Sequence, residues 1–286
     1  MAVPLDPGSV LATYGLTEAD LARIVARRTR AGPSLDGRLD EAAWAAADWS
    51  GRFVDMVSGV PGLYDTRVAA LWDDEALYVG YRVEEPFVRG RLTERDDLIW
   101  YDDDVELFIA GPDAYYEIEV NALGTIYEVL HLWADACVPG GPFDRPEFDP
   151  RRRDARGFTG NGDPEHWDWD GLHPRGHRWS FLDWDLPGLR AVVHVDGTLN
   201  DDRDVDRGWT VELALPWAGL AAIGGHDLPP RAGDEWRCCF ARFKNLEFNG
   251  RRILPTAGWT LNRHGRYDIH VPEAFSLLTL SDEVAG

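Results

Sequence analysis

The stretch that decides the fold is residues 99–121, IWYDDDVELFIAGPDAYYEIEVN. Apolar and polar residues alternate with a period of two on both sides of the Gly-Pro-Asp tripeptide at 111–113, which is the pattern of half-buried β-strands. Glycine, proline and aspartate are turn residues, so the two alternating runs predict a β-hairpin. We therefore expect a β-rich protein organised around this hairpin.

The expected register of the hairpin brings two acidic side chains together. With Ala110 opposite Tyr115, Glu106 lies opposite Glu119. Directly opposed side chains in an antiparallel pair are about 5 Å apart at Cβ. Two carboxylates so placed repel each other unless a cation, a proton or a hydrogen-bonding ligand lies between them. This face is therefore a candidate binding surface, and a solvated face on an acidic protein is the alternative.

A third strand is expected at residues 125–130, TIYEVL. A two-residue turn at Leu123-Gly124 would bring this strand back so that Glu119 faces Glu128. Glu106, Glu119 and Glu128 would then form one acidic row across three strands, with the aromatic ring of Trp100 at its edge.

Further strands are predicted along the chain by alternating or apolar runs, at 66–72, 77–83, 179–181, 191–195, 208–217, 234–244 and 275–280. Residues 23–29 fit either a helix or a first strand. Helical patterns are few and short, so the fold class is all-β, an antiparallel, jelly-roll-like β-sandwich. We expect an N-terminal arm over residues 1–30 and a single domain over 31–286, with the polar segment 139–176 as a long insertion loop.

The composition excludes some partners and favours others. The chain of 286 residues has 29 Lys and Arg against 50 Asp and Glu, a formal net charge of −21. Such a charge repels phosphate, so we expect neither nucleic acid nor an anionic membrane as a partner. Thirteen tryptophans exceed the needs of a core, and indoles on a polar surface favour stacking on a flat ligand such as a sugar ring.

The cysteines and the first residues bear on the expected compartment. Cys137, Cys238 and Cys239 follow no disulfide or metal-binding spacing, and we expect them to be packing residues. The start, MAVPLD, lacks the basic and apolar regions of a signal peptide, and no apolar run is long enough for a membrane span. We expect a cytoplasmic protein, or a secreted one if a leader has been removed.

An ordered set of motifs runs through most of the chain: LDG at 35–37 with Trp44, LWDDEALYV at 71–79, WYDDDVELF at 100–108, YYEIEVNALGT at 115–125, GWTVELALPW at 208–217, GDEWR at 233–237, FAR at 240–242, GW at 258–259 and HVPEAF at 270–275. In this order the motifs resemble the family 9 carbohydrate-binding modules and their DOMON-like relatives. The chain would be a stand-alone form with an insertion.

The resemblance implies a binding site for a mono- or oligosaccharide between two tryptophan rings. Trp100 matches one wall, and Trp259 is similar to the other. Glu106, six residues after Trp100, would accept hydrogen bonds from sugar hydroxyls. The remaining polar contacts implied are Glu119, Asn121 and Arg242.

The resemblance also implies a structural calcium ion, for which Asp102, Asp103 and Asp104 are candidate ligands. His173 and His177 have the i, i+4 spacing of some zinc sites, but Pro174 and Gly176 disfavour the helix that such a site requires. A haem-binding DOMON-like carrier would need axial Met or His ligands, and Met1 and Met56 are poorly placed for that role.

Two functions remain open at this point. The first is non-catalytic carbohydrate binding through a tryptophan-walled, carboxylate-lined site. The alternative is a glycoside hydrolase on the same face, because the two acids of a retaining glycosidase are about 5 Å apart. Its acid and nucleophile or base would be Glu106 with Glu119 or Glu128.

Overall fold

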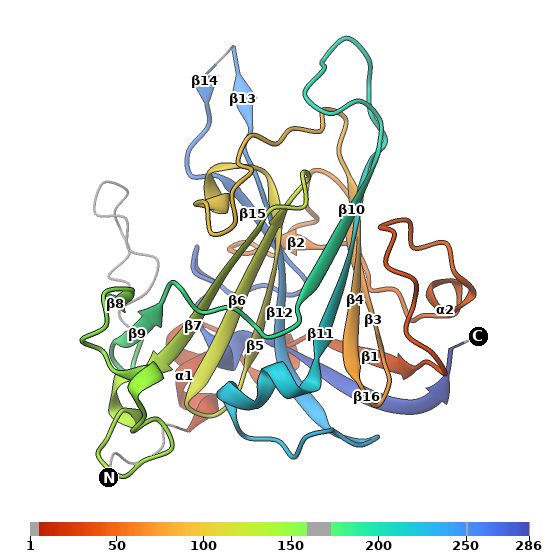
Figure 1. Ribbon diagram of the computed structural model, residues 1–286. Coiled ribbons are helices and arrows are strands. Elements are labelled where there is room, and N and C mark those ends of the chain that lie inside the picture. The colour runs from red at the N-terminus through yellow and green to blue at the C-terminus, as the bar shows by residue number, and fades with distance from the viewer. Residues whose placement is uncertain (1–5, 159–172, 250, 286) are drawn as a thin grey trace.

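β-Strands dominate the computed structural model, which describes residues 6–158, 173–249 and 251–285 (Figure 1). The strands are β1 (Arg23–Arg28), β2 (Val54–Asp55), β3 (Thr66–Trp72), β4 (Ala76–Glu84), β5 (Asp104–Ala110), β6 (Ala114–Asn121), β7 (Ile126–Trp133), β8 (Ala155–Phe158), β9 (Arg178–Phe181), β10 (Arg190–Asp196), β11 (Gly208–Pro216), β12 (Glu235–Lys244), β13 (Glu247–Phe248), β14 (Arg251–Arg252), β15 (Ala257–Thr260) and β16 (Ser276–Val284).

The helices between them are short. They are α1 (Pro7–Thr13), α2 (Ala42–Ala45) and the 3₁₀ turns η1 (Glu18–Asp20), η2 (Ile99–Tyr101), η3 (Ala134–Ala136), η4 (Pro146–Phe148), η5 (Trp217–Ile223) and η6 (Pro272–Ala274). Over the described ranges, none of these helices has the length and apolar character that crossing a membrane requires.

One large sheet curls over to form both layers of a β-sandwich. Its strand order is β10-β11-β4-β3-β1-β16-β12-β5-β6-β7-β9-β8. The two halves face each other, because the Tyr81 hydroxyl on β4 donates to the Glu106 carbonyl on β5 at 2.8 Å although four strands separate β4 from β5 in the order. The β-sandwich predicted from the sequence is confirmed, with parallel pairing where β1 meets β16 and β3.

The core lies between the two halves. β5 contributes Val105, Leu107 and Ile109 to it, and β4 contributes Val79 and Tyr81 from the opposite layer. These residues alternate with side chains on the outer face of the sheet, as the period-two pattern requires. The alternation in the sequence therefore locates the core side of β5 correctly.

The register of the central hairpin agrees with the prediction. Ala110 pairs with Tyr115, and Glu106 lies directly opposite Glu119. Residues 23–29, whose pattern fits either a helix or a strand, form strand β1 (Arg23–Arg28) and the residue that follows it.

The predicted register of the third strand is wrong by one residue. Glu119 is opposite Tyr127, and Glu128 is opposite Ile118. The loop has three residues instead of two, since the Asn121 N–H bonds the Thr125 carbonyl and Gly124 takes a φ of 81°. A left-handed third loop residue is typical of such hairpins, and a one-residue slip turns every side chain to the other face. Glu128 therefore does not belong to the acidic row.

The polar segment at 139–176 is partly ordered into η4 and β8, and β8 pairs with β9 at the end of the sheet. His166, Trp167 and Trp169, which belong to this segment, lie outside the described residues.

Candidate functional site

A polar row lies on the outer face of the sheet formed by β5, β6 and β7, opposite to the core side. The register brings Asp104 and Glu106 of β5 next to Glu117 and Glu119 of β6, and β7 adds Tyr127 and His131. The segment between β15 and β16 contributes Ile269, His270 and Phe275 to the layer packed on this face. All four carboxylates are consequently buried.

Three carboxyl groups of the row converge. Ligand oxygens of Asp104, Glu106 and Glu119 lie within 4.8 Å of one another. One oxygen of each has no hydrogen-bond partner in the described structure: Asp104 Oδ2, Glu106 Oε2 and Glu119 Oε2. A buried polar atom without a partner is costly. The row is therefore suited to receive hydroxyl groups, a cation or protons.

Burial controls the ionisation of these three groups. Loss of solvation raises the pKa of Glu106 well above its ordinary range, and the charges of Asp104 and Glu117 raise it further. Burial and then the charge of Glu106 raise the pKa of Glu119 in the same way. Burial raises the pKa of Asp104, although the Phe243 N–H donates to it and lowers that pKa. Burial and mutual repulsion therefore favour the protonated form of these carboxyl groups.

A second group of side chains, beside the three carboxyl groups, contains Glu117 and two histidines, His131 and His270. His131 Nε2 is 2.7 Å from Glu117 Oε2, and His270 Nε2 is 3.9 Å from Glu117 Oε1. Loss of solvation lowers the pKa of both imidazoles, that of His270 well below its ordinary value. Both histidines are therefore neutral at physiological pH.

Trp100 is exposed, as the predicted stacking role requires. It lies on η2, just before β5, with 38% of its surface accessible. Its ring contacts Tyr127 edge-on with a centroid distance of 5.1 Å and lies 5.8 Å from the Tyr101 ring. Tyr127 is in turn the strand partner of Glu119. The rings of Trp100 and Tyr127 therefore lie between the protein surface and the acidic row.

Trp259 is not a second wall, and the prediction that it pairs with Trp100 is corrected. It is only 3% exposed and packs in the core against Tyr64 and the Arg242 guanidinium. Trp259 is opposite Arg242, which is opposite Val105 on the core side. It thus faces away from Glu106. Four strand intervals, about 19 Å in all, also separate β15 from β7, whose Tyr127 contacts the Trp100 ring.

Arg242 has a structural partner instead of a ligand. Its guanidinium is fully buried, 2.5 Å from Glu85 Oε2, and also donates to Thr66 and to the Glu84 carbonyl. Lys244 joins the same network through Glu85 at 3.2 Å. Arg242 therefore lies on the core side of the sheet, and its predicted sugar contact is wrong.

Asn121 lies at the end of the acidic row, opposite Asp104. Its amide oxygen accepts from the backbone N–H groups of Leu123 and Thr125, and its amide nitrogen donates to Asp102. These bonds hold the β6–β7 loop, so Asn121 supports the row.

Glu128, named in the hydrolase alternative, points to the core side. Its carboxylate pairs with Arg95 and accepts from the Leu186 N–H. Burial raises its pKa to about 8, while those two donors lower it. Glu128 cannot act together with Glu106 because the sheet lies between them.

The candidate calcium ligands fit the ion only in part. Asp102 accepts from the backbone N–H groups of Arg91 and Leu92, and Asp103 is held by Lys244 and Asn245. Both carboxylates already have their hydrogen-bond partners. Asp104 is different, because its unpaired oxygen belongs to the acidic row.

His173 and His177 do not form a joint site. His173 is buried, with its Nε2 3.0 Å from Glu273 Oε2, whereas His177 is exposed beside Trp179. The two imidazoles therefore have different surroundings.

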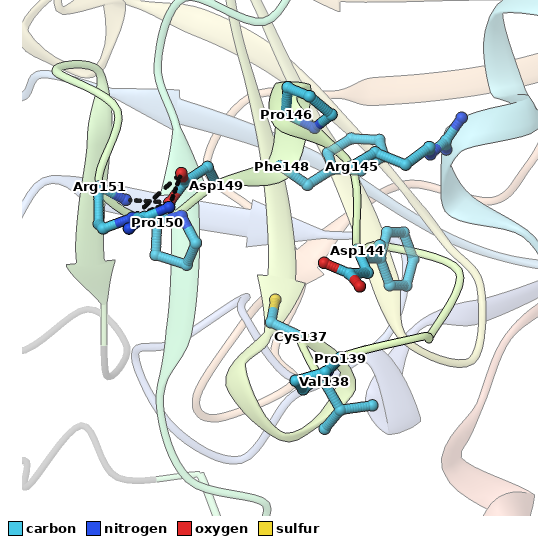
Figure 2. Close-up of a pocket in the computed structure, with 11 residues that line it drawn as sticks. Cys137, Val138, Pro139, Asp144, Arg145, Pro146, Phe148, Asp149, Pro150 and Arg151 are labelled. Atoms are coloured by element: carbon cyan, nitrogen blue, oxygen red, sulfur yellow. Dashed lines mark hydrogen bonds and ion pairs between the residues drawn. The ribbon is translucent and has the colours of Figure 1, made fainter.

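A surface pocket of about 380 Å³ lies in the 137–151 segment (Figure 2). Its wall includes Phe143, Phe148 and Arg145, and the guanidinium of Arg145 lies 4.8 Å above the Phe148 ring. Asp149 and Arg151 pair with each other at 2.6 Å on one side of the pocket, as the dashed lines in Figure 2 mark. The lining contains no residue of the acidic row.

The residues that the sequence analysis missed are Glu117, Tyr127, His131 and His270. Glu117 lies two residues before Glu119 on β6 and therefore on the same outer face, so the alternating pattern of the hairpin predicts its position. Tyr127 and His131 needed the correct register of β7. His270 comes from a loop that packs across the sheet, a placement that no local pattern encodes.

The fold is a β-sandwich with a buried acidic row on the outer face of β5, β6 and β7. Residues 58–138 match the family model described as "Carbohydrate-binding family 9". This match confirms, over that segment, the resemblance drawn from the sequence. A search among curated proteins finds no match to this chain.

Solved structures are similar to this chain at low sequence identity. One is a protein from Bacteroides uniformis ATCC 8492, provisionally described as carbohydrate-binding, with 14% identity and a TM-score of 0.57 over 91% of this chain and 100% of that chain. Another is a family 9 carbohydrate-binding module from Caldicellulosiruptor kristjanssonii. In complex with cellotriose it has 15% identity and a TM-score of 0.47, covering 91% of this chain and 93% of that one. In complex with glucose the values are 16% and 0.47, covering 91% and 95%.

Proposed function

We propose that the protein binds carbohydrate on the outer face of β5, β6 and β7. The observation that carries the proposal is the row of unpaired carboxyl oxygens on Asp104, Glu106 and Glu119, next to the exposed ring of Trp100. The match to a carbohydrate-binding family supports it, because residues 58–138 contain all four of these residues.

Each part of this face suits one feature of a sugar. A pyranose presents axial C–H groups that pack on an indole, and Trp100 offers that surface. Hydroxyl groups donate to carboxylates in charge-assisted hydrogen bonds, which are stronger than neutral ones. The formal net charge of −21 favours a neutral sugar over an anionic one.

Binding requires the cover of the row to move. Glu106 is 3% and Glu119 2% exposed. Tyr127 lies between Trp100 and Glu119 by its ring contact and its strand pairing. We propose that a change in the Tyr127 side chain opens the row to a sugar stacked on Trp100. A carboxyl group of the row then releases its proton to solvent and accepts a hydrogen bond from a sugar hydroxyl in its place.

We also propose a calcium site, with ligands that differ from the Asp102, Asp103 and Asp104 set expected from the sequence. Asp104, Glu106 and Glu119 provide the hard oxygen atoms that the ion prefers, with ligand oxygens within 4.8 Å of one another. A bound calcium ion would supply fixed positive charge to the row. Sugar binding is therefore to be measured both with calcium and with a chelator.

The hydrolase alternative is not favoured. The family that matches is a binding family, and Glu128 lies on the other face of the sheet from Glu106.

Calorimetric titration with neutral mono- and oligosaccharides, beginning with glucose and cellotriose, tests the proposal. We expect Trp100→Ala to reduce affinity by more than 10-fold, since burying a large apolar side chain contributes roughly 1.5–3 kcal/mol. The matched control is Phe87→Ala, because the Phe87 ring is equally exposed, at 38%. Phe87 follows β4, in a segment whose residues 85 and 86 form backbone hydrogen bonds with residues 206 and 207. No binding of any sugar, or equal binding by the Trp100→Ala variant, would contradict the proposal.

A further inference from the structure

We infer that Glu117, His131 and His270 form a buried site for a divalent transition metal of the zinc type. The Nε2 atoms of both histidines approach the same carboxylate, at 2.7 Å and 3.9 Å from its two oxygens. The three ligand atoms lie within 4.8 Å of one another. The three residues come from β6, β7 and the segment before η6, so the convergence is a product of the tertiary fold.

The hydrogen bonds behind the histidines support this inference. Metal-binding imidazoles use one nitrogen for the ion and the other for a hydrogen bond that holds the ring. Here His131 Nδ1 is 2.9 Å from Ser180 Oγ, and His270 Nδ1 is 3.1 Å from the Tyr115 hydroxyl. Both Nδ1 atoms are thus engaged by hydroxyl groups, and both Nε2 atoms are directed to Glu117.

The rings around the site hold the imidazoles in place. Tyr115 stacks on His131 with a centroid distance of 4.5 Å, and Phe158 lies 4.6 Å from His270. Phe108 contacts His270 edge-on at 5.2 Å. An apolar shell of this kind limits solvent access to a metal site, and one water molecule would complete the tetrahedral coordination of an ion held by three protein ligands.

The charges around Glu117 favour a cation. Its neighbours on the same sheet face are Asp104, Glu106 and Glu119, which have unpaired oxygens. The guanidinium of Arg178 donates to the Tyr115 hydroxyl and so lies one shell further out. With a metal bound, the Nδ1–H of His270 donates to the Tyr115 oxygen, whose second lone pair accepts from Arg178.

The donor set selects the type of ion. Calcium and magnesium prefer oxygen ligands, whereas two imidazoles and one carboxylate are the protein ligands of many zinc sites. Bonds of about 2.0–2.2 Å in a tetrahedron separate two ligand atoms by about 3.3 Å. The two observed separations, 2.7 and 3.9 Å, lie on either side of this value, and all three ligand atoms lie within 4.8 Å of one another, so side-chain movements on the order of 1 Å would seat the ion.

The test measures zinc in the full chain. The protein is refolded with zinc chloride or with EDTA, desalted, and examined by elemental analysis and thermal unfolding. We expect one zinc ion per chain and a higher midpoint of unfolding with zinc, because a ligand that binds only the folded state stabilises it. Loading with cobalt(II) is expected to give the visible absorption of a tetrahedral site.

Variants locate the ion. Glu117→Gln and His270→Gln are expected to weaken zinc binding by more than about 100-fold, and Ser180→Ala by about 10–100-fold, since it removes only the supporting bond. His173→Gln is the matched control, because His173 is a buried histidine paired with a different carboxylate, Glu273, at 3.0 Å. It should bind zinc as the unmodified protein does.

Two results would overturn the inference: no zinc in the refolded unmodified protein, or undiminished zinc binding in His270→Gln. The zinc content of the unmodified protein decides the matter even where a variant fails to fold. The inference goes beyond sugar binding and fails separately from it, because Trp100→Ala should lose sugar affinity and keep its zinc.

Discussion

Glu106 and Glu119 are directly opposed across β5 and β6, and each has a carboxyl oxygen without a partner among the residues that the structure describes. Neighbouring strands lie about 4.8 Å apart, so two ionised carboxylates in this position repel strongly. The folded protein therefore retains protons here, or binds something that replaces them. The proximity of Glu106 and Glu119 lowers the stability of the fold locally, and the hydrogen-bonded sheet keeps the two residues together. Functional sites are often destabilised in this way.

The first prediction concerns this pair. The pKa of Glu106 is raised in the folded state, so the folded chain binds a proton that the unfolded chain has already lost, and stability falls as the pH rises. Glutamine has no such proton. We expect Glu106→Gln to be more stable than the unmodified protein by roughly 1–2 kcal/mol at pH 8, and by less at pH 5.

Urea unfolding at both pH values, without added metal, measures this difference. The same gain at pH 5 and pH 8 would show that ionisation of Glu106 is not its cause. Glu235→Gln is a suitable control, since Glu235 is an exposed residue paired with Arg23 on the surface.

The second prediction separates the two tryptophans that the sequence placed in one site. Trp259→Ala empties part of the core and should cost roughly 3–5 kcal/mol of unfolding free energy. Trp100→Ala removes an exposed ring, and the expected change is within about 1 kcal/mol. Urea denaturation monitored by circular dichroism compares them, and equal losses would contradict the placement of Trp259.

The third prediction concerns the buried ion pair of Arg242 and Glu85. Arg242→Ala leaves the Glu85 carboxylate without its closest cation, so a loss of roughly 3–5 kcal/mol is expected. Arg23→Ala breaks an exposed pair with Glu235 and should cost at most about 1 kcal/mol. The ratio of the two losses is the measurement, and a ratio near one would be inconsistent with a buried network.

How far the sequence predicts this molecule depends on the range of the interaction. The register of the β5–β6 hairpin was predictable, because alternation fixes the faces and the turn at 111–113 fixes the pairing. The register of β7 was not, since it depends on the left-handed backbone of Gly124. That single conformation moved Glu128 off the outer face and put Tyr127 and His131 on it.

Contacts distant in sequence account for the remaining errors. Trp259 has small neighbours that suggest an exposed ring, but Tyr64 packs against it, a contact between residues nearly 200 positions apart in the chain. Arg242 of β12 is paired directly with Trp259 of β15, so the two side chains lie on the same face of the sheet, which is the core side. Only the pairing of β12 with β5 and β15 reveals this.

The position of β1 has a consequence for how the chain folds during synthesis. β1 lies between β3 and β16 in the middle of the sheet (Figure 1). The strand at residues 23–28 must therefore wait for its partner at 276–284, so the hydrogen bonds that join the two halves form only after residue 284 has left the ribosome. Such long-range pairing gives a high contact order and slow folding. Until β16 emerges, the growing chain has two unfinished sheet edges for chaperones to cover.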